Sequence, residues 1–363
     1  MKRESRFNLM ALFIMLAIVM VPFLSSCGDD DDTPGATADK TEINALIAEC
    51  ETLLSQATTA DYPEASITTF RERVAAIKSA VSSESITQTQ VNNLLIQLQE
   101  AKTVFEQSAY DALPLDNMLL YWSFDEGEGN ALTSAGTENW VARLTQGPSQ
   151  VFGSNAASPA FVDGVKGKAL SFSNGACLQI DEYRENALLS NQLSVVMWVN
   201  PSQTRAGNYL LSFNYWNNWK FNLQELNKPF FTVATTTATV DADDEGSGVP
   251  LNEWSQVAVT LNLNNGEMVF YINGEVSKTW TKDTKGGLDG TQKEAYRTAS
   301  GAQLPFLIGS ATTYAEAASW SWSSNPIQPE AWDSFYGIMD EIRVFNTTLS
   351  PGQILKLYND EKN

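Results

Sequence analysis

Two aspartates lie on segments that alternate between apolar and polar residues. Asp125 ends the run Leu119–Asp125, and Asp340 lies within the run Gly337–Val344. Alternation with a period of two predicts strands, and in the second run it places Asp340 on one face with three apolar residues, Ile338, Ile342 and Val344. A carboxylate in an apolar row is costly unless it is paired, hydrogen-bonded or bound to a metal. Pairing of the two strands would bring Asp125 and Asp340 within reach of each other.

The composition excludes several chemistries. The 363 residues contain no histidine, which excludes Ser-His-Asp, Cys-His and His-ligated zinc mechanisms. There are 43 acidic and 23 basic residues, a formal net charge of −20. Nucleic acids and anionic membrane surfaces need a basic footprint, so this charge argues against both partners.

Five of the ten tryptophans lie in two polar segments rich in turn residues, 215–219 and 319–332. They are Trp216, Trp219, Trp320, Trp322 and Trp332. Indole faces stack on the C–H bonds of sugar rings, while neighbouring Asn, Ser and Asp side chains hydrogen-bond the hydroxyls. The two segments are therefore candidates for a carbohydrate-binding surface. The alternative is that these indoles cover a hydrophobic core, as loop aromatics often do.

The N-terminus predicts export and lipidation. A basic start with Lys2, Arg3 and Arg6 precedes an apolar run that ends at Leu24, too short for comfortable membrane spanning. Leu24-Ser25-Ser26-Cys27 resembles a lipobox, so residues 1–26 are expected to be removed as a signal peptide and Cys27 to be acylated. The alternative is an ordinary secretory signal with a chance cysteine. Residues 27–38 would form an acidic tether.

Within this tether, Asp29 to Asp32 form an acidic run directly after the cysteine. Such a run is usually a solvated linker. Behind a lipidated cysteine it resembles the export tag of lipoproteins that some Gram-negative bacteria display on their surface. We therefore expect a protein anchored by lipid in the outer membrane and exposed at the cell surface.

Residues 39–112 show three apolar stripes with helical spacing. Asp39 with Glu42, and Thr87 with Gln90, have the spacing of capping boxes at the start of the first and third stripes. Short connections predict an antiparallel three-helix bundle. The pattern resembles the small FIVAR-type bundles that act as spacers in bacterial surface proteins. The remaining cysteines, Cys50 and Cys177, are expected to be buried free thiols.

From Pro114 onward the apolar period changes from helical to two, which predicts a second domain over 114–363. Many short strands with turns and no intervening helices indicate an all-β sandwich. Asn273-Gly274 fits a two-residue hairpin turn, because both positions tolerate positive φ. A final helix carries Ile354, Leu355 and Leu357. Beyond the two runs described above, strands are expected at 168–172, 193–199, 209–213, 219–223, 256–261 and 268–272.

Ordered landmarks over roughly residues 117–360 resemble the laminin-G-like, concanavalin A-type jelly roll. They include Tyr121–Gly129, Gly164–Leu170, Val196–Val199, Phe270–Gly274, Phe306–Gly309 and Asp340–Arg343. The resemblance implies the fold and says little about function, because lectins, adhesion modules and glycanases share it. Glycanases of this type carry Glu-x-Asp-x-x-Glu on one strand, and this chain has no such triplet. We therefore expect no catalysis.

Members of this family often hold Ca²⁺ near the paired terminal strands, which would make Asp125 and Asp340 its ligands. The chain departs from the family at Thr133-Ser134-Ala135-Gly136, where relatives often show Asp-Ser-Ser-Gly. The alternative is that backbone amides satisfy Asp340 and that Arg343 is structural.

Together these features predict a surface lipoprotein whose jelly roll binds a polysaccharide or oligosaccharide without cleaving it. A protein-adhesion or structural module of an outer-membrane complex is the second hypothesis, and a carboxylate-pair glycoside hydrolase is the third.

Overall fold

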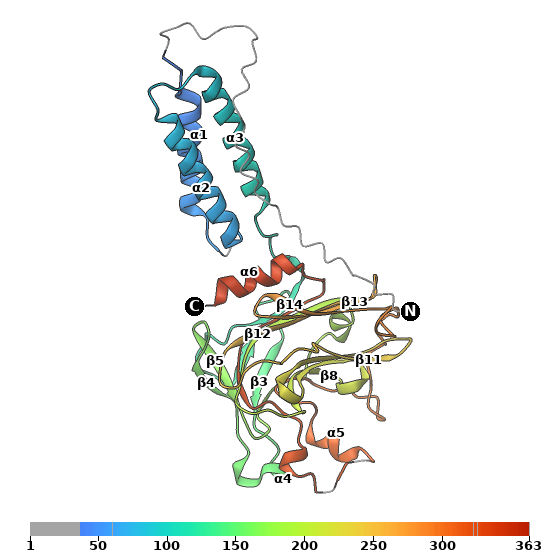
Figure 1. Cartoon of the computed structure of the whole chain (residues 1–363). Helices are drawn as coiled ribbons and strands as arrows, with labels where there is room; N and C mark the ends of the chain where they lie inside the picture. Colours follow the sequence, from blue (N-terminus) through green and yellow to red (C-terminus); the bar gives the residue numbers. More distant parts are fainter. Residues whose placement is uncertain (1–36, 60, 322, 325, 363) are drawn as a thin grey trace, which may run out of the picture.

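A computed structural model describes residues 37–59, 61–321, 323–324 and 326–362, and it contains three helices followed by a two-layered β-sandwich (Figure 1). This architecture confirms the predicted fold class. The helices rise from the side of the sandwich that the C-terminal helix α6 (Pro351–Glu361) covers, while α4 (Ser149–Phe152) and α5 (Tyr314–Ser319) lie at the opposite side.

The N-terminal unit consists of α1 (Thr41–Gln56), α2 (Glu64–Val81) and α3 (Gln88–Gln107). One apolar stripe from each helix is buried in a common core that includes Ile43, Phe70 and Leu98. The capping box of Thr87 and Gln90 is confirmed. The box predicted for Asp39 and Glu42 is wrong. The first helix begins one residue later than that box requires, and Asp39 instead accepts a hydrogen bond from the Thr41 amide at 2.9 Å.

None of the helices in the described part of the chain combines the length and hydrophobicity that a membrane span requires. Cys50 and Cys177 are both buried and free, as predicted.

The sandwich consists of two antiparallel sheets. The first has the strand order β14-β13-β12-β7-β16-β5-β4, with β1 paired to β16, and the second has the order β11-β10-β9-β8-β15-β6-β3-β2. The strands of the first sheet are β1 (Met118–Trp122), β4 (Ala160–Asp163), β5 (Lys168–Phe172), β7 (Gln192–Pro201), β12 (Ser255–Asn262), β13 (Glu267–Ile272), β14 (Glu275–Thr281) and β16 (Gly337–Phe345). Those of the second are β2 (Ala131–Thr133), β3 (Val141–Thr145), β6 (Cys177–Ile180), β8 (Asn208–Phe213), β9 (Trp219–Leu223), β10 (Pro229–Ala234), β11 (Thr239–Asp243) and β15 (Phe306–Ile308).

Side chains from the inner faces of both sheets fill one core. Alternation along each strand sends every second residue inward, which is how Val257 and Val259 of β12 join Phe221 and Phe231 of the second sheet in one core. The hairpin turn between β13 and β14 is confirmed, because Asn273 and Gly274 have φ values of 52° and 82°.

Strand β16 lies between β7 and β5 and also pairs with β1, which confirms the predicted pairing of the first and last strands. Its alternation is interrupted by a β-bulge between Asp340 and Arg343, where Glu341 has φ of 52°. The bulge inserts one extra residue, so Met339 and Ile342 both reach the core. The prediction that Asp340 shares a face with Ile342 is therefore wrong.

Beyond the bulge, Arg343 points away from the core and beneath α6. Its guanidinium pairs with Glu341 at 2.5 Å and with Glu361 of α6 at 2.6 Å, and all three side chains are buried. Trp198 donates its indole N–H to Glu361 at 2.7 Å. Ile354 and Leu357 of α6 complete the contact by packing on Val196 and Phe345.

Replacing Arg343 with Leu should cost about 3–5 kcal/mol of unfolding free energy, because it leaves two buried carboxylates without their cation. Denaturant unfolding measures the loss. A matched control is Arg184→Leu, since Arg184 pairs with Glu138 while its own side chain is 69% exposed. That change should cost about 1 kcal/mol or less. Equal losses in the two variants would contradict the structural role of the buried pairs.

Candidate functional site

The outer face of the second sheet, opposite the core, is polar yet buried. In β9 and β10 the residues that alternate with core phenylalanines are Lys220, Asn222 and Thr232, and each is at most 1% exposed. Loops cover this face: the Ala206 carbonyl accepts a hydrogen bond from Asn222 at 3.4 Å, and the Ala311 carbonyl accepts one from Ser212 of the neighbouring strand β8 at 2.6 Å. Buried polar groups that are not needed for the core make this face a candidate site.

An aromatic cluster, formed by Tyr209, Tyr215, Trp216 and Trp320, lies on this face. Tyr215 follows the end of β8 and stacks on Tyr209 at 5.8 Å and on Trp320 at 5.1 Å between ring centroids. Trp216 meets Tyr215 edge-on at 5.9 Å. The two segments that carry these rings are about a hundred residues apart in sequence, and the sandwich brings them together.

Lys220 lies beneath this cluster, fully buried among aromatic rings. Its ammonium is 4.2 Å from the centroid of Trp216, 4.8 Å from that of Phe230 and 5.1 Å from that of Tyr209. It donates one hydrogen bond, to Asn222 at 3.0 Å. Burial lowers the pKa of Lys220 to about 8, and the negative charges of Asp241 and Asp333 oppose that shift. Ring faces attract the cation and compensate part of its lost hydration.

Asp333 approaches the same face from the segment before β16. Burial raises the pKa of Asp333 to about 6, while Arg205 and Lys220 act to lower it. The carboxylate comes so close to Gly207 that a Cβ there would lie 2.0 Å from its Oδ1. The Arg205 guanidinium holds this segment in place by donating hydrogen bonds to the carbonyls of Glu330 and Trp332, at 3.2 and 3.0 Å.

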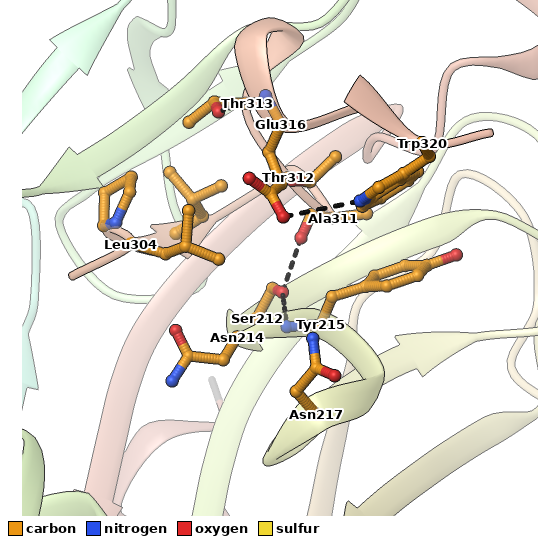
Figure 2. A pocket seen from close by; sticks show the side chains of 12 residues that line it. Ser212, Asn214, Tyr215, Asn217, Leu304, Ala311, Thr312, Thr313, Glu316 and Trp320 are labelled. Atoms are coloured by element: carbon orange, nitrogen blue, oxygen red, sulfur yellow. Dashed lines mark hydrogen bonds between the residues drawn. The ribbon is translucent and has the colours of Figure 1, made fainter. Parts of the chain in front are cut away.

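A small hollow adjoins the aromatic cluster (Figure 2). Its free volume is about 10 Å³, enough for about one water molecule. Tyr215 and Trp320 lie on one side of it, with Glu316 and Asn214 also in the lining. The Glu316 carboxylate accepts the Trp320 indole N–H at 3.4 Å, which orients the ring. The hollow therefore combines an aromatic wall with hydrogen-bonding groups.

The predicted tryptophans lie in different environments. Trp216 is 37% exposed and Trp320 is half-buried beside the hollow. Trp219 is fully buried in the main core and donates to the Leu188 carbonyl at 3.0 Å. Trp332 is 4% exposed and packs in a smaller apolar cluster with Phe152. These two positions correct the expectation that all five indoles line the surface. Trp322 lies outside the described residues.

The position of Trp219 follows from strand alternation. It is the first residue of β9, and alternate residues of a strand share a face, so Trp219 points to the core with Phe221 and Leu223. Lys220 points outward. The sequence analysis missed Lys220, Asp333 and Asn214. Lys220 and Asn222 were visible as the polar partners in an alternating strand, but no local signal shows that loops bury them.

Asp125 and Asp340 both anchor the turn between β4 and β5. Asp340 accepts hydrogen bonds from the amides of Val165 and Lys166, at 3.0 and 3.3 Å, and from its neighbour Glu341 at 2.8 Å. Asp125 accepts one from the Lys168 amide at 2.9 Å. Burial raises the pKa of Asp340 to about 7, while the amide donors act to lower it.

This arrangement fits anchoring of the turn better than a Ca²⁺ site. The hydrogen-bond donors to both carboxylates among the described residues are backbone N–H groups, which occupy oxygen lone pairs that a cation would need. Across the described ranges, no three acidic or cysteine side chains are grouped to hold a metal ion. Calcium binding stays a prediction.

Cys27 and the acidic run Asp29 to Asp32 lie outside the described residues.

A model of the family described as the concanavalin A-like lectin/glucanases superfamily matches residues 173–355. No curated protein sequence matches the chain. Among solved structures, domain 4 of AbnA, an extracellular arabinanase from Geobacillus stearothermophilus in complex with arabinotriose, is 21% identical with a TM-score of 0.45. The alignment covers 67% of this chain and 98% of that one.

Two toxin domains are similar to this chain with comparable TM-scores. The binding domain of Paraclostridial Mosquitocidal Protein 1 is 13% identical with a TM-score of 0.45. The receptor-binding domain of botulinum neurotoxin C/D mosaic serotype is 18% identical with a TM-score of 0.43. Each alignment covers 68% of this chain and 52% of the other, so the match spans about half of those proteins.

Replacing Asp340 with Ala should lower the unfolding free energy by about 3 kcal/mol, because three amide N–H groups lose their acceptor. Chelation of divalent cations should leave the melting temperature of the unaltered protein unchanged. Thermal melts with and without chelator, and after calcium is added back, measure both effects. A melting temperature that falls on chelation and recovers with calcium would contradict the anchoring role and favour a metal site.

Proposed function

Because the chain belongs to the concanavalin A-like lectin/glucanases superfamily, we propose that it binds a glycan without cleaving it and does so as a lipoprotein at the cell surface. The observation that carries this proposal is the aromatic cluster on the outer face of the second sheet. Its rings come from two distant segments and meet beside a hollow lined by amide, hydroxyl and carboxylate groups. Sugars present the complementary surface, apolar C–H faces edged by hydroxyls.

The charges of the site support recognition of hydroxyls rather than catalysis. Glycoside hydrolysis needs two carboxylates that face each other across the substrate. Around the aromatic cluster, Asp241 accepts the Thr232 hydroxyl at 2.6 Å and Glu316 accepts the Trp320 indole. The positive charges of Arg205 and Lys220 act to lower the pKa of Asp333. These carboxylates are each engaged with protein groups, which suits a binding surface.

Exposed apolar residues give little support to a protein-adhesion surface. Such a role favours one contiguous apolar patch. The large apolar side chains that are exposed in the described part of the chain are instead distributed over separate elements. Examples are Val104 on α3, Val141 on β3 and Val276 on β14. The aromatic cluster, by contrast, combines ring faces and hydrogen-bonding groups at one place, as a sugar-binding surface requires.

Replacing Trp216 with Ala should weaken glycan binding about tenfold, which corresponds to about 1.4 kcal/mol. Loss of the ring above Lys220 should cost about 2 kcal/mol or less of unfolding free energy, so the variant still folds. Trp320→Ala tests the second segment. A glycan array with residues 33–363 identifies the ligand, and titration calorimetry with that glycan measures the change. The same samples are assayed for released reducing ends, which should not appear.

Trp280→Ala is a matched control. Trp280 is also half-buried and covers a lysine, with Lys278 4.3 Å from its centroid, but it lies on β14 of the other sheet. Its removal should leave the affinity unchanged. If all three variants bind the glycan equally well, the aromatic cluster is not the binding surface. If no glycan on the array binds, the proposed function is wrong.

The lipid anchor has its own test. In a Gram-negative host, Cys27→Ala should abolish acylation, so that the protein is released or stays as an unprocessed precursor. Replacing Asp29 to Asp32 with Ala should keep it membrane-bound but protected from external protease. Fractionation, mass spectrometry and protease shaving measure these outcomes. A Cys27→Ala protein of mature mass that still fractionates with membranes contradicts lipidation.

A further inference from the structure

Asn214 lies between the end of β8 and the aromatic ring of Tyr215, in the lining of the hollow (Figure 2). It has a left-handed backbone conformation, with φ 59° and ψ 31°, and is only 2% exposed. Asparagine tolerates this conformation better than most residues. The backbone of the hairpin therefore fixes where the side-chain amide begins.

A chain of hydrogen bonds fixes which way that amide faces. Asn218 donates through Nδ2 to the carbonyls of Lys293 and Glu294, at 3.2 and 3.1 Å, so its Oδ1 must be the acceptor. That Oδ1 accepts the Tyr296 amide at 2.9 Å and Nδ2 of Asn214 at 2.8 Å. Nδ2 of Asn214 is thus committed to Asn218, and a flip of the amide would set two oxygens against each other.

This leaves Oδ1 of Asn214 as an acceptor with no donor from any described residue. A buried polar atom without a hydrogen bond costs about 1–3 kcal/mol, which a suitable ligand group would recover. The hollow has room for about one water molecule, and therefore for one hydroxyl rather than a whole sugar ring. The ring itself has to remain outside, beside the half-buried indole of Trp320, which stacks on Tyr215 in the wall of the hollow.

We infer that Oδ1 of Asn214 accepts a hydrogen bond from one hydroxyl of the bound glycan, and that this contact selects a neutral sugar. The inference rests on the proposed function. Among the described residues that line the hollow, the charged side chain is Glu316, and none is a lysine or arginine. An acceptor beside a carboxylate matches a hydroxyl donor and repels the carboxylate of a uronic acid. A site built around such a hydrogen bond discriminates strongly against sugars that lack the donor.

The test uses Asn214→Gly, because glycine keeps the left-handed backbone and removes only the amide. Asn227→Gly is the matched control. Asn227 is also left-handed, with φ 54°, 1% exposed, and has an unpartnered Oδ1, but it lies between β9 and β10 away from the hollow's lining. Circular dichroism and thermal melts establish that both variants fold.

The probes are neutral polysaccharides (arabinan, xylan, galactan, mannan and dextran) and two acidic ones (polygalacturonate and hyaluronan), in affinity electrophoresis with the full chain from residue 33. We expect one or more neutral polymers to bind, Asn214→Gly to weaken that binding at least about tenfold, and Asn227→Gly to leave it unchanged. Binding of a neutral polymer that Asn214→Gly alters by less than twofold overturns the inference while glycan binding stands, and water then fills the hollow. Binding of the acidic polymers alone overturns it as well. If the unaltered protein binds none of the polymers, the proposed function fails and the inference with it.

Discussion

The bulge at Glu341 is the constraint on which most of the sandwich depends. Strand β16 is bonded to β7, β5 and β1, so a change in its register would reach every part of the first sheet. One inserted residue sends Asp340 to the turn after β4 and places Glu341 and Arg343 under α6. These buried polar side chains are stable in the interior because Asp340 accepts backbone amides and Glu341 pairs with Arg343. Helix α6 is therefore needed to cover these side chains, and its Glu361 carboxylate pairs with Arg343 of β16.

The same helix connects the two units of the chain. Lys356 of α6 pairs with Asp61, in the connection between α1 and α2, at 3.1 Å, and Gln353 donates to the Ala112 carbonyl at 2.7 Å. These contacts are few and partly exposed, so they orient the three-helix unit without merging it with the sandwich core. Because α5 precedes Trp320 and lies at the side of the sandwich opposite the three helices, the proposed glycan site lies away from the three-helix unit (Figure 1).

The second sheet shows how a sandwich makes a site from the face that its core does not use. Alternation needs only one side of β9 for packing, which leaves Lys220 and Asn222 on the other. Loops from three parts of the chain then cover that side and bring Asp333, Tyr215 and Trp320 to it. The cover is incomplete beside Tyr215. Lys220 is thus held by aromatic ring faces and the side-chain amide of Asn222. In the lining of the hollow, Oδ1 of Asn214 has no hydrogen-bond donor among the described residues.

Local pattern by itself determined the fold class. Helical spacing predicted α1 to α3, and period-two alternation predicted β1 and β16 as strands, because both patterns record which side of an element is buried. Tertiary structure decided which side chains reach the surface. Trp216 and Trp219 are three residues apart in one polar stretch, yet only Trp216 is exposed, because β9 begins at Trp219 and turns it inward. The bulge at Glu341 and the burial of Lys220 likewise depend on pairing and covering loops from distant parts of the chain, which no local window of sequence contains.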